Sequence, residues 1–225
     1  MGLFARLFAF ITKRSGYTPP THTCGDFGYE LAEDGAVLTE YNGHALELEI
    51  PAQIDGHPVA EITDGLFYLC DDMRTLKIPS CVSRIGLNPF DGCEALTRID
   101  IAEGSPFTMD GGALIDTHTQ HIISYLSALT ESEHRVPGGT RSIGDGAFFG
   151  CRNLRRVILP ASMRTIGEDA FRSCEELRDM NIPDHLSEIG DYAFLGCHDE
   201  FTLSIGQNAY AREYANENDV RTQRV

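Results

Sequence analysis

The amino-acid sequence predicts a repeat solenoid of the α/β class, built from short strands and helical turns. Two observations support this prediction. A pattern recurs three times between residues 143 and 205, with copies beginning at Ile143, Ile166 and Ile189, a spacing of 23 residues. A fixed period of this size is typical of solenoids, in which each repeat packs against its neighbours. Within each copy, moreover, the apolar spacing changes from the helical period to the strand period.

The residues that recur within one copy indicate how a single coil folds. Ala147, Phe148 and Cys151 lie at positions i, i+1 and i+4, which share one side of a helical turn. Val157 and Leu159 then alternate like a short strand with one buried face. Stacked coils can bury this apolar side, whereas a lone coil cannot. The phenylalanines expected in one buried column are Phe67, Phe90, Phe148, Phe171 and Phe194.

A glycine follows the recurring isoleucine, at Gly144, Gly167 and Gly190. Glycine adopts backbone conformations that other residues avoid. We therefore expect each of these glycines to form a tight corner between two elements. Pro160 and Pro183 follow the predicted strands, where a residue without an N–H group suits a strand end.

The full pattern, I-G-x-x-A-F-x-x-C-x-x-L-x-x-I-x-I-P, resembles the BspA-type branch of leucine-rich repeats. The resemblance covers roughly residues 27 to 220. It implies a leucine-rich-repeat right-handed superhelix of short strands and helical turns, with a hairpin insert and caps. In bacterial relatives it also implies adhesion or recognition of a host surface, which is an analogy from the fold alone.

The chain divides into four predicted regions. Residues 1–26 form an amphipathic segment and a linker, and residues 27–58 form a hairpin cap. Residues 59–206 form the leucine-rich-repeat solenoid, and residues 207–225 form a closing helical cap. We expect the solenoid to be one continuous domain, because coils need no single central core.

Residues 105–139 interrupt the repeat, and we expect a degenerate coil in which a hairpin replaces the helical turn. The hairpin would pair residues 109–115 with residues 122–126. His118 and His121 lie at its tip and could ligate a metal. No third ligand has a suitable spacing, so a solvated loop without a metal is the expected state.

Residues 1–14 predict a short amphipathic helix, to which Arg6, Lys13 and Arg14 supply positive charge. Its apolar face consists of Leu3, Phe4, Leu7, Phe8 and Ile11. The segment can cap the solenoid or form a loose tail, contact a membrane surface, or act as a targeting peptide. We accordingly expect a cytoplasmic or peripheral membrane location, with the cell surface or secretion as the alternative.

Composition restricts the classes of partner. The net charge is −16, from 18 basic and 34 acidic side chains. This charge repels phosphate backbones, so nucleic acid is not an expected partner. No apolar run is long enough for a membrane-spanning helix. We expect a monomer that binds a protein partner and carries no cofactor.

Five of the seven cysteines recur in the repeat, in the column of Cys151. The cysteines of this column are Cys70, Cys93, Cys151, Cys174 and Cys197. Column neighbours could approach disulfide distance, since stacked strands lie about 4.8 Å apart. Buried free thiols are the favoured interpretation, because the total is odd and the setting is apolar. Zinc binding is a third interpretation, but the chain lacks a C-x-x-C pair.

Function should lie on the outward columns, because the inward columns pack the core. Five arginines lie beside the predicted strands and form a candidate contact surface for carboxylates or other anions. These arginines are Arg74, Arg98, Arg155, Arg156 and Arg178. The alternative is a mixed solvated face, neutralised by acidic residues that precede the strands.

Catalysis has little support in the sequence. No phosphate-binding loop, no G-x-S-x-G turn and no H-E-x-x-H helix occurs. The predicted function is therefore a non-catalytic interaction module for protein recognition or adhesion. A membrane-peripheral scaffold held by residues 1–14 is the alternative, and a thiol-dependent enzyme that uses a column cysteine is a third hypothesis.

Overall fold

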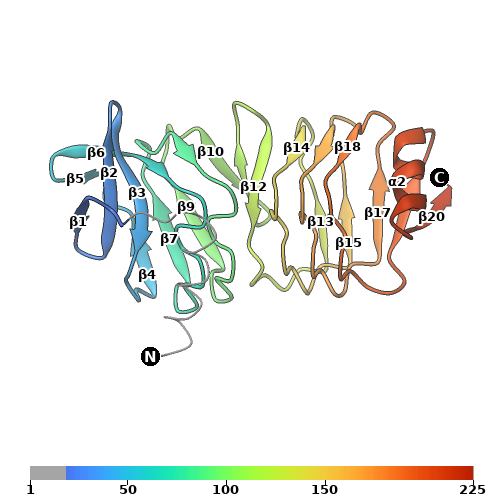
Figure 1. The fold of residues 1–225 in the computed structure, drawn as a ribbon, viewed down its shortest axis with the longest axis horizontal. Coiled ribbons are helices and arrows are strands. Elements are labelled where there is room, and N and C mark those ends of the chain that lie inside the picture. The colour runs from blue at the N-terminus through green and yellow to red at the C-terminus, as the bar shows by residue number, and fades with distance from the viewer. Residues whose placement is uncertain (1–18, 225) are drawn as a thin grey trace.

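The structure is a computed structural model in which residues 19–224 are described. These residues form an elongated stack of strands that runs from the N-terminal hairpin to a C-terminal helix (Figure 1). The predicted amphipathic face within residues 1–14 lies outside the described residues. The stack is built from two pairs of sheets, one pair in each half, and the strands of the insert at residues 105–131 belong to the first sheet of the C-terminal half.

The N-terminal half begins with a hairpin and continues into the first two coils. The hairpin strands β2 and β3 are antiparallel, and β3 pairs in parallel with β6 of the first coil. The first sheet contains β1 (His22–Cys24), β2 (Phe27–Ala32), β3 (Gly35–Tyr41), β5 (Gln53–Ile54), β6 (His57–Ile62) and β8 (Arg84–Ile85). The second contains β4 (Glu47–Glu49), β7 (Thr75–Ile78) and β9 (Arg98–Ile101), all parallel.

The insert is a three-stranded antiparallel meander, so the prediction that residues 109–115 pair with residues 122–126 as one hairpin is only partly right. Its strands are β10 (Phe107–Asp110), β11 (Ala113–Asp116) and β12 (His121–Tyr125). The expected first strand divides because Gly111 and Gly112 both have positive φ, 50° and 93°, and reverse the chain. The second turn does lie at the predicted tip, where Asp116 pairs with His121.

The C-terminal half stacks three coils and a cap with a shift of 23 residues, as when Ile143 pairs with Ile166 and Ile166 with Ile189. Its first sheet continues from β12 through β14 (Ser142–Ile143), β16 (Thr165–Ile166) and β18 (Glu188–Ile189). Its second sheet contains β13 (Glu133–Arg135), β15 (Arg156–Ile158), β17 (Asp179–Ile182), β19 (Thr202–Ile205) and β20 (Arg221–Arg224).

The coils within residues 19–224 contain no helix, so the α/β class and the helical turns of the predicted fold are not confirmed. The A-F-x-x-C segment forms a hydrogen-bonded arc of turns instead. The reason is the acceptor that the backbone N–H groups of the segment use. Phe148 N–H donates to the carbonyl of Ala170 in the next coil, at 2.8 Å, rather than to a carbonyl four residues earlier. Each arc is thereby bonded to its neighbour, as a strand would be.

One helix, α2 (Ala209–Glu217), lies within the described residues and closes the C-terminal end. Its N-cap is Asn208, whose Oδ1 accepts a hydrogen bond from Ala211 N at 2.9 Å. The amide nitrogen of Asn208 also donates to the carbonyl of Leu186, at 2.7 Å. Ala211, Tyr214 and Ala215 form its buried face. Asn208 therefore both starts the helix and fixes it to the last coil.

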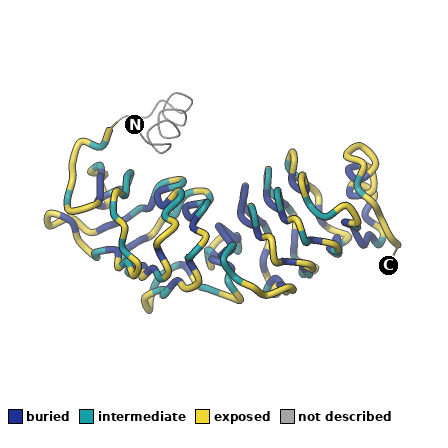
Figure 2. Tube along the Cα trace, turned by 90° about the horizontal axis from the view of Figure 1, so that it is seen from below, coloured by how far each residue is buried: buried dark blue, intermediate teal, exposed yellow. Residues whose placement is uncertain are grey.

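The core lies between the two sheets of each half and divides into two clusters (Figure 2). Leu129 of the insert packs against both clusters. In the first cluster, the rings of Phe67 and Phe90 stack with centroids 5.8 Å apart. In the second, Phe171 stacks between Phe148 and Phe194, at 4.8 and 5.8 Å. The predicted phenylalanine column is thus present, but the insert interrupts it.

Tyr125 and His134 are two polar residues in the second cluster. Tyr125 precedes Phe148 by one period and stacks on it at 4.8 Å. His134 packs against both rings and pairs with Val157 in the strand register. Tyr125 Oη and His134 Nε2 have no hydrogen-bond partner within residues 19–224. Burial therefore lowers the pKa of His134 below its ordinary value.

This burial predicts a stability that decreases in weak acid. As the pH falls below about 6.5, the unfolded chain binds a proton at His134 while the folded chain does not. The free energy of unfolding should fall by at most about 1.4 kcal/mol per pH unit for this one proton. Urea denaturation between pH 7.5 and pH 5.5 measures the slope. His134→Phe should reduce this slope. The remaining slope should come from His121, whose pKa is also lowered by burial. His118 is exposed, so the control His118→Phe should leave the slope unchanged.

Candidate functional site

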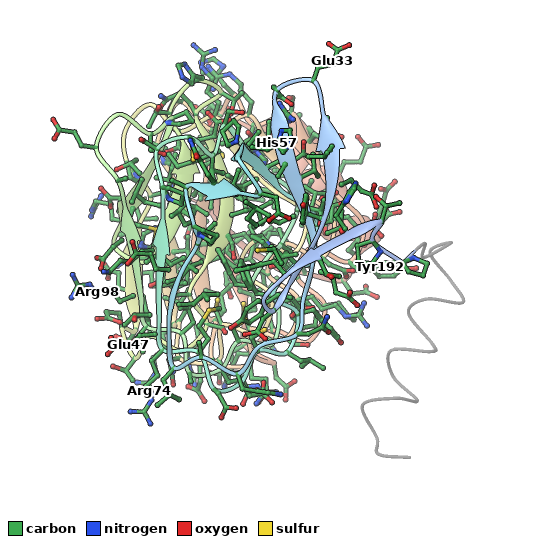
Figure 3. All side chains as sticks on the ribbon, turned by 90° about the vertical axis from the view of Figure 1, so that its left-hand side faces the viewer. Glu33, Glu47, His57, Arg74, Arg98 and Tyr192 are labelled. Atoms are coloured by element: carbon green, nitrogen blue, oxygen red, sulfur yellow. The ribbon has the colours of Figure 1, made fainter. Side chains whose placement is uncertain are left out.

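The outward side of the β7–β9 and β13–β15–β17–β19 strands, here called the strand face, carries the five predicted arginines. All five arginines are exposed beside these strands. The structure places them in two groups, because the insert separates the two sheets. Arg74 and Arg98 lie on the N-terminal half, on the same side of the molecule as Glu47 (Figure 3). Arg155, Arg156 and Arg178 lie on the C-terminal half.

Acidic side chains accompany the C-terminal group. Glu176 lies between Arg155 and Arg178, with N–O distances of 3.4 and 3.9 Å. Arg178 also bonds Glu200 at 2.8 Å, and Arg156 bonds its strand neighbour Asp179 at 3.1 Å. Exposed ion pairs of this kind each contribute about 0–1 kcal/mol. These ion pairs hold the guanidinium groups in place. Because each pair is weak, a partner can displace its acidic side chain at little cost in free energy.

The N-terminal group is less paired. Arg98 Nε lies 2.8 Å from a carboxylate oxygen of Asp100, two residues along the same strand. Arg74 has no ion pair within residues 19–224. A bound carboxylate could therefore reach the Arg74 guanidinium without displacing an acidic side chain.

The column cysteines line the inner side of the arcs. Cys93, Cys151 and Cys174 are buried, and all seven cysteines are free thiols. Two of the buried thiols donate to carbonyl oxygens of the previous coil: Cys93 Sγ lies 2.9 Å from Phe67 O, and Cys174 Sγ lies 3.1 Å from Phe148 O. The side-chain hydrogen bond that the neutral Cys174 thiol makes with Cys151, together with burial, raises the pKa of Cys174 well above its ordinary value. A thiol in this state is a poor nucleophile at neutral pH.

These thiols provide a direct test of the thiol-enzyme hypothesis. We expect Cys93, Cys151 and Cys174 of the native protein to remain unmodified by DTNB at pH 8, because burial blocks access to all three. Raised pKa values also suppress the thiolate form of Cys93 and Cys174. The same thiols should react fully in denaturant, which is the control for reagent activity. Mass spectrometry of the trapped peptides assigns each site. Rapid labelling of Cys174 in the native protein would contradict the inert interpretation.

The histidines at the tip of the insert do not converge. His121 Nδ1 lies 2.7 Å from Ser142 Oγ and is partly buried, whereas His118 is exposed. Within the described part of the chain, no group of three His, Cys, Asp or Glu side chains could hold a metal ion. Likewise, no helix in residues 19–224 has the length and apolar character needed to cross a membrane.

A hollow at the C-terminal end is a second candidate site, which the sequence did not indicate. We call it the C-terminal hollow; its volume is about 250 Å³. Tyr192 and Leu195 form its outer wall, with 60% and 50% of their surfaces exposed. Its floor is Phe194 and Phe201, and α2 and the start of β20 flank it through Tyr214 and Arg221.

The stacked parallel strands and the period of 23 residues define a leucine-rich-repeat protein. The chain belongs to the BspA-type leucine-rich repeat family, whose model matches residues 60–122 and 124–218 in six copies. A leucine-rich repeat protein of T. pallidum is 30% identical to the chain, with 82% of this chain and 70% of that chain covered and a TM-score of 0.43. No curated protein matches the chain.

Two further solved structures share the fold. A leucine-rich repeat protein from Eubacterium ventriosum has a TM-score of 0.61 at 22% identity, and the match covers 70% of this chain and 41% of that one. One from Bacteroides ovatus has a TM-score of 0.51 at 20% identity, covering 91% and 67%. The chain thus spans less than half of the Eubacterium protein. Membership in this repeat family supports a general role in binding other molecules.

Proposed function

We propose that the protein is a non-catalytic interaction module that binds a protein partner through the strand face. The observation that carries this proposal is the row of outward guanidinium groups at Arg155, Arg156 and Arg178, which repeats with the coils and takes no part in core packing. Arginine forms paired hydrogen bonds with carboxylates and is enriched at protein interfaces. A partner with carboxylates at coil spacing is the chemistry that fits.

The strand face can supply arginine–carboxylate contacts to a partner because its own ion pairs are weak and its backbone is rigid. The parallel register fixes the positions of Arg156 and Asp179, which are directly paired residues of β15 and β17. The side chains of this surface are therefore organised before binding, which reduces the entropy lost on association. Arg74 and Arg98 extend the same kind of surface on the N-terminal half.

A matched pair of variants tests the proposal. Arg155→Glu/Arg178→Glu reverses two charges in one column of the strand face. Arg141→Glu/Arg164→Glu reverses two charges in the same coils, one period apart, beside the opposite sheet. We expect the first variant to lose at least about tenfold in affinity for a partner isolated with the wild-type chain, and the second to retain affinity. Equal affinities of both variants would refute the assignment to the strand face.

A further inference from the structure

The arcs of coils one, three and four each donate three main-chain hydrogen bonds to the coil that follows. In coil three, the N–H groups of Gly146, Phe148 and Gly150 bond carbonyls of the next coil at 2.8, 2.8 and 2.9 Å. The three acceptors are Glu168, Ala170 and Arg172, which are two residues apart from one another. Coil four repeats the arrangement toward Asp191, Ala193 and Leu195, at 3.0, 2.8 and 2.8 Å. We call these three N–H groups the donor row of a coil.

An unusual backbone conformation aims the donor row along the axis of the stack. The first and last residues of the row have positive φ: 62° and 67° in coil three, at Gly146 and Gly150. Coil five keeps this conformation, with φ of 55° at Tyr192 and 77° at Gly196. Positive φ is uncommon for a bulky residue such as Tyr192. The last coil is therefore shaped to donate to a further arc, although no further coil follows within residues 19–224.

The donor row of coil five has no acceptor among the described residues. The N–H groups of Tyr192, Phe194 and Gly196 make no hydrogen bond in residues 19–224. The cap explains the vacancy: β20 pairs with β19 in the position of the next strand, and α2 lies against β18 and β19. Only the short connection at residues 218–220 joins α2 to β20. The layer above coil five therefore has a strand and a helix but no arc, and the C-terminal hollow occupies that place.

We propose that the C-terminal hollow binds a short peptide segment of another protein by main-chain addition to this donor row. The occupant would present carbonyl oxygens at alternate residues, as the arcs of coils four and five do for the coils before them. Main-chain hydrogen bonds would supply sequence-tolerant affinity, and the wall of Tyr192 and Leu195 would favour an apolar side chain. If a partner covered these three N–H groups without accepting hydrogen bonds from them, their desolvation would cost free energy. An occupant with matching carbonyl acceptors is therefore favoured.

The charges of the hollow favour peptide carbonyls over a free anion. Successive N–H groups in alternating backbone conformations can bind anions. Here, however, Asp199 and Asp219 line the hollow together with the single guanidinium of Arg221. Two carboxylates against one cation repel a free anion, whereas neutral carbonyls are unaffected.

This site is separate from the strand face. Seen along the axis of the stack, Arg98 and Tyr192 lie on opposite sides of the molecule (Figure 3). The inference consequently does not depend on the function proposed for the arginines. A protein partner on the strand face would leave Tyr192 accessible.

The test uses the full chain labelled with ¹⁵N and a capped synthetic peptide with the sequence of residues 166–176, carrying Cys174→Ser to prevent oxidation. This sequence is the natural occupant of the equivalent place above coil three. We expect saturable shifts of the Tyr192, Phe194 and Gly196 amide resonances. The engaged amides of Asp169, Phe171 and Ser173 are the internal reference and should not shift.

Variants and a second probe distinguish the possible outcomes. Tyr192→Ala, which removes one wall of the hollow, should weaken peptide binding roughly tenfold. Phe149→Ala removes an exposed aromatic ring from coil three, outside the hollow, and should not weaken peptide binding. No shift at millimolar peptide would overturn the proposal. So would sodium acetate alone shifting the three amides as strongly as the peptide, because the row would then be an anion site.

Discussion

Replacing Phe171 by alanine is expected to lower the free energy of unfolding by about 3–5 kcal/mol, the largest effect of any single substitution predicted for this chain. Phe171 is completely buried, and its ring lies between those of Phe148 and Phe194. Truncation removes two aromatic contacts and leaves a cavity in the middle of the stack. The coils above and below cannot close this cavity, because main-chain hydrogen bonds fix their spacing.

Thermal denaturation followed by circular dichroism measures this effect. A loss of this size corresponds to a melting temperature lower by on the order of 10 °C. Phe149→Ala is the matched control. Phe149 follows Phe148, the counterpart of Phe171 in coil three, but its side chain is 37% exposed. Its expected effect is below about 1 kcal/mol. Similar losses in both variants would mean that the ring stack is not what holds the coils together.

The sequence predicted the register of the coils well, because the register depends on the period alone. Pairs such as Ile143 with Ile166 follow directly from the spacing of 23 residues. The phenylalanine column was predicted for the same reason. Tyr125 was not predicted in this column, although it lies one period before Phe148, because the repeat pattern has phenylalanine at this position.

The arcs and the donor row could not be predicted from the sequence. The spacing of Ala170, Phe171 and Cys174 fits one side of a helical turn as well as an arc. What decides between them is the acceptor of the Phe171 N–H group, which is Ala193, 22 residues away. Periodicity within a single coil carries no information about this bond. The positive φ at Tyr192 could not be predicted either, because tyrosine does not favour this conformation.

The arginine columns show a different limit. Their placement beside the strands followed from the repeat, and Arg156 does pair with Asp179 across the register. Their division into two groups did not follow, because the insert sequence does not reveal how far it separates the sheets. Whether these arginines bind a partner is a question of surface chemistry, which the repeat pattern leaves open.

Replacing Gly190 by alanine is expected to have the second large effect on the free energy of unfolding. Gly190 is one of the glycines that follow each recurring isoleucine. The expectation that these glycines form corners requiring special φ values is wrong, since Gly144, Gly167 and Gly190 all lack positive φ. Glycine is needed here for space. A Cβ atom on Gly190 would lie 2.6 Å from the carbonyl carbon of Gly167 and 2.7 Å from the Cα of Glu168, both backbone atoms of the previous coil.

A methyl group at this position must therefore push two coils apart, because backbone held in a hydrogen-bonded ladder cannot rotate away as a side chain can. The Gly190 N–H bonds the Ile166 carbonyl at 2.8 Å, and this bond would lengthen. We expect Gly190→Ala to lower the free energy of unfolding by about 1–3 kcal/mol in urea denaturation. Gly138→Ala is the control, because a Cβ there meets no atom within 4 Å, and it should be neutral or slightly stabilising. If Gly190→Ala were as well tolerated as Gly138→Ala, the coils would have to be free to separate. The close stacking of coils three to five would then not be the source of the fold's rigidity.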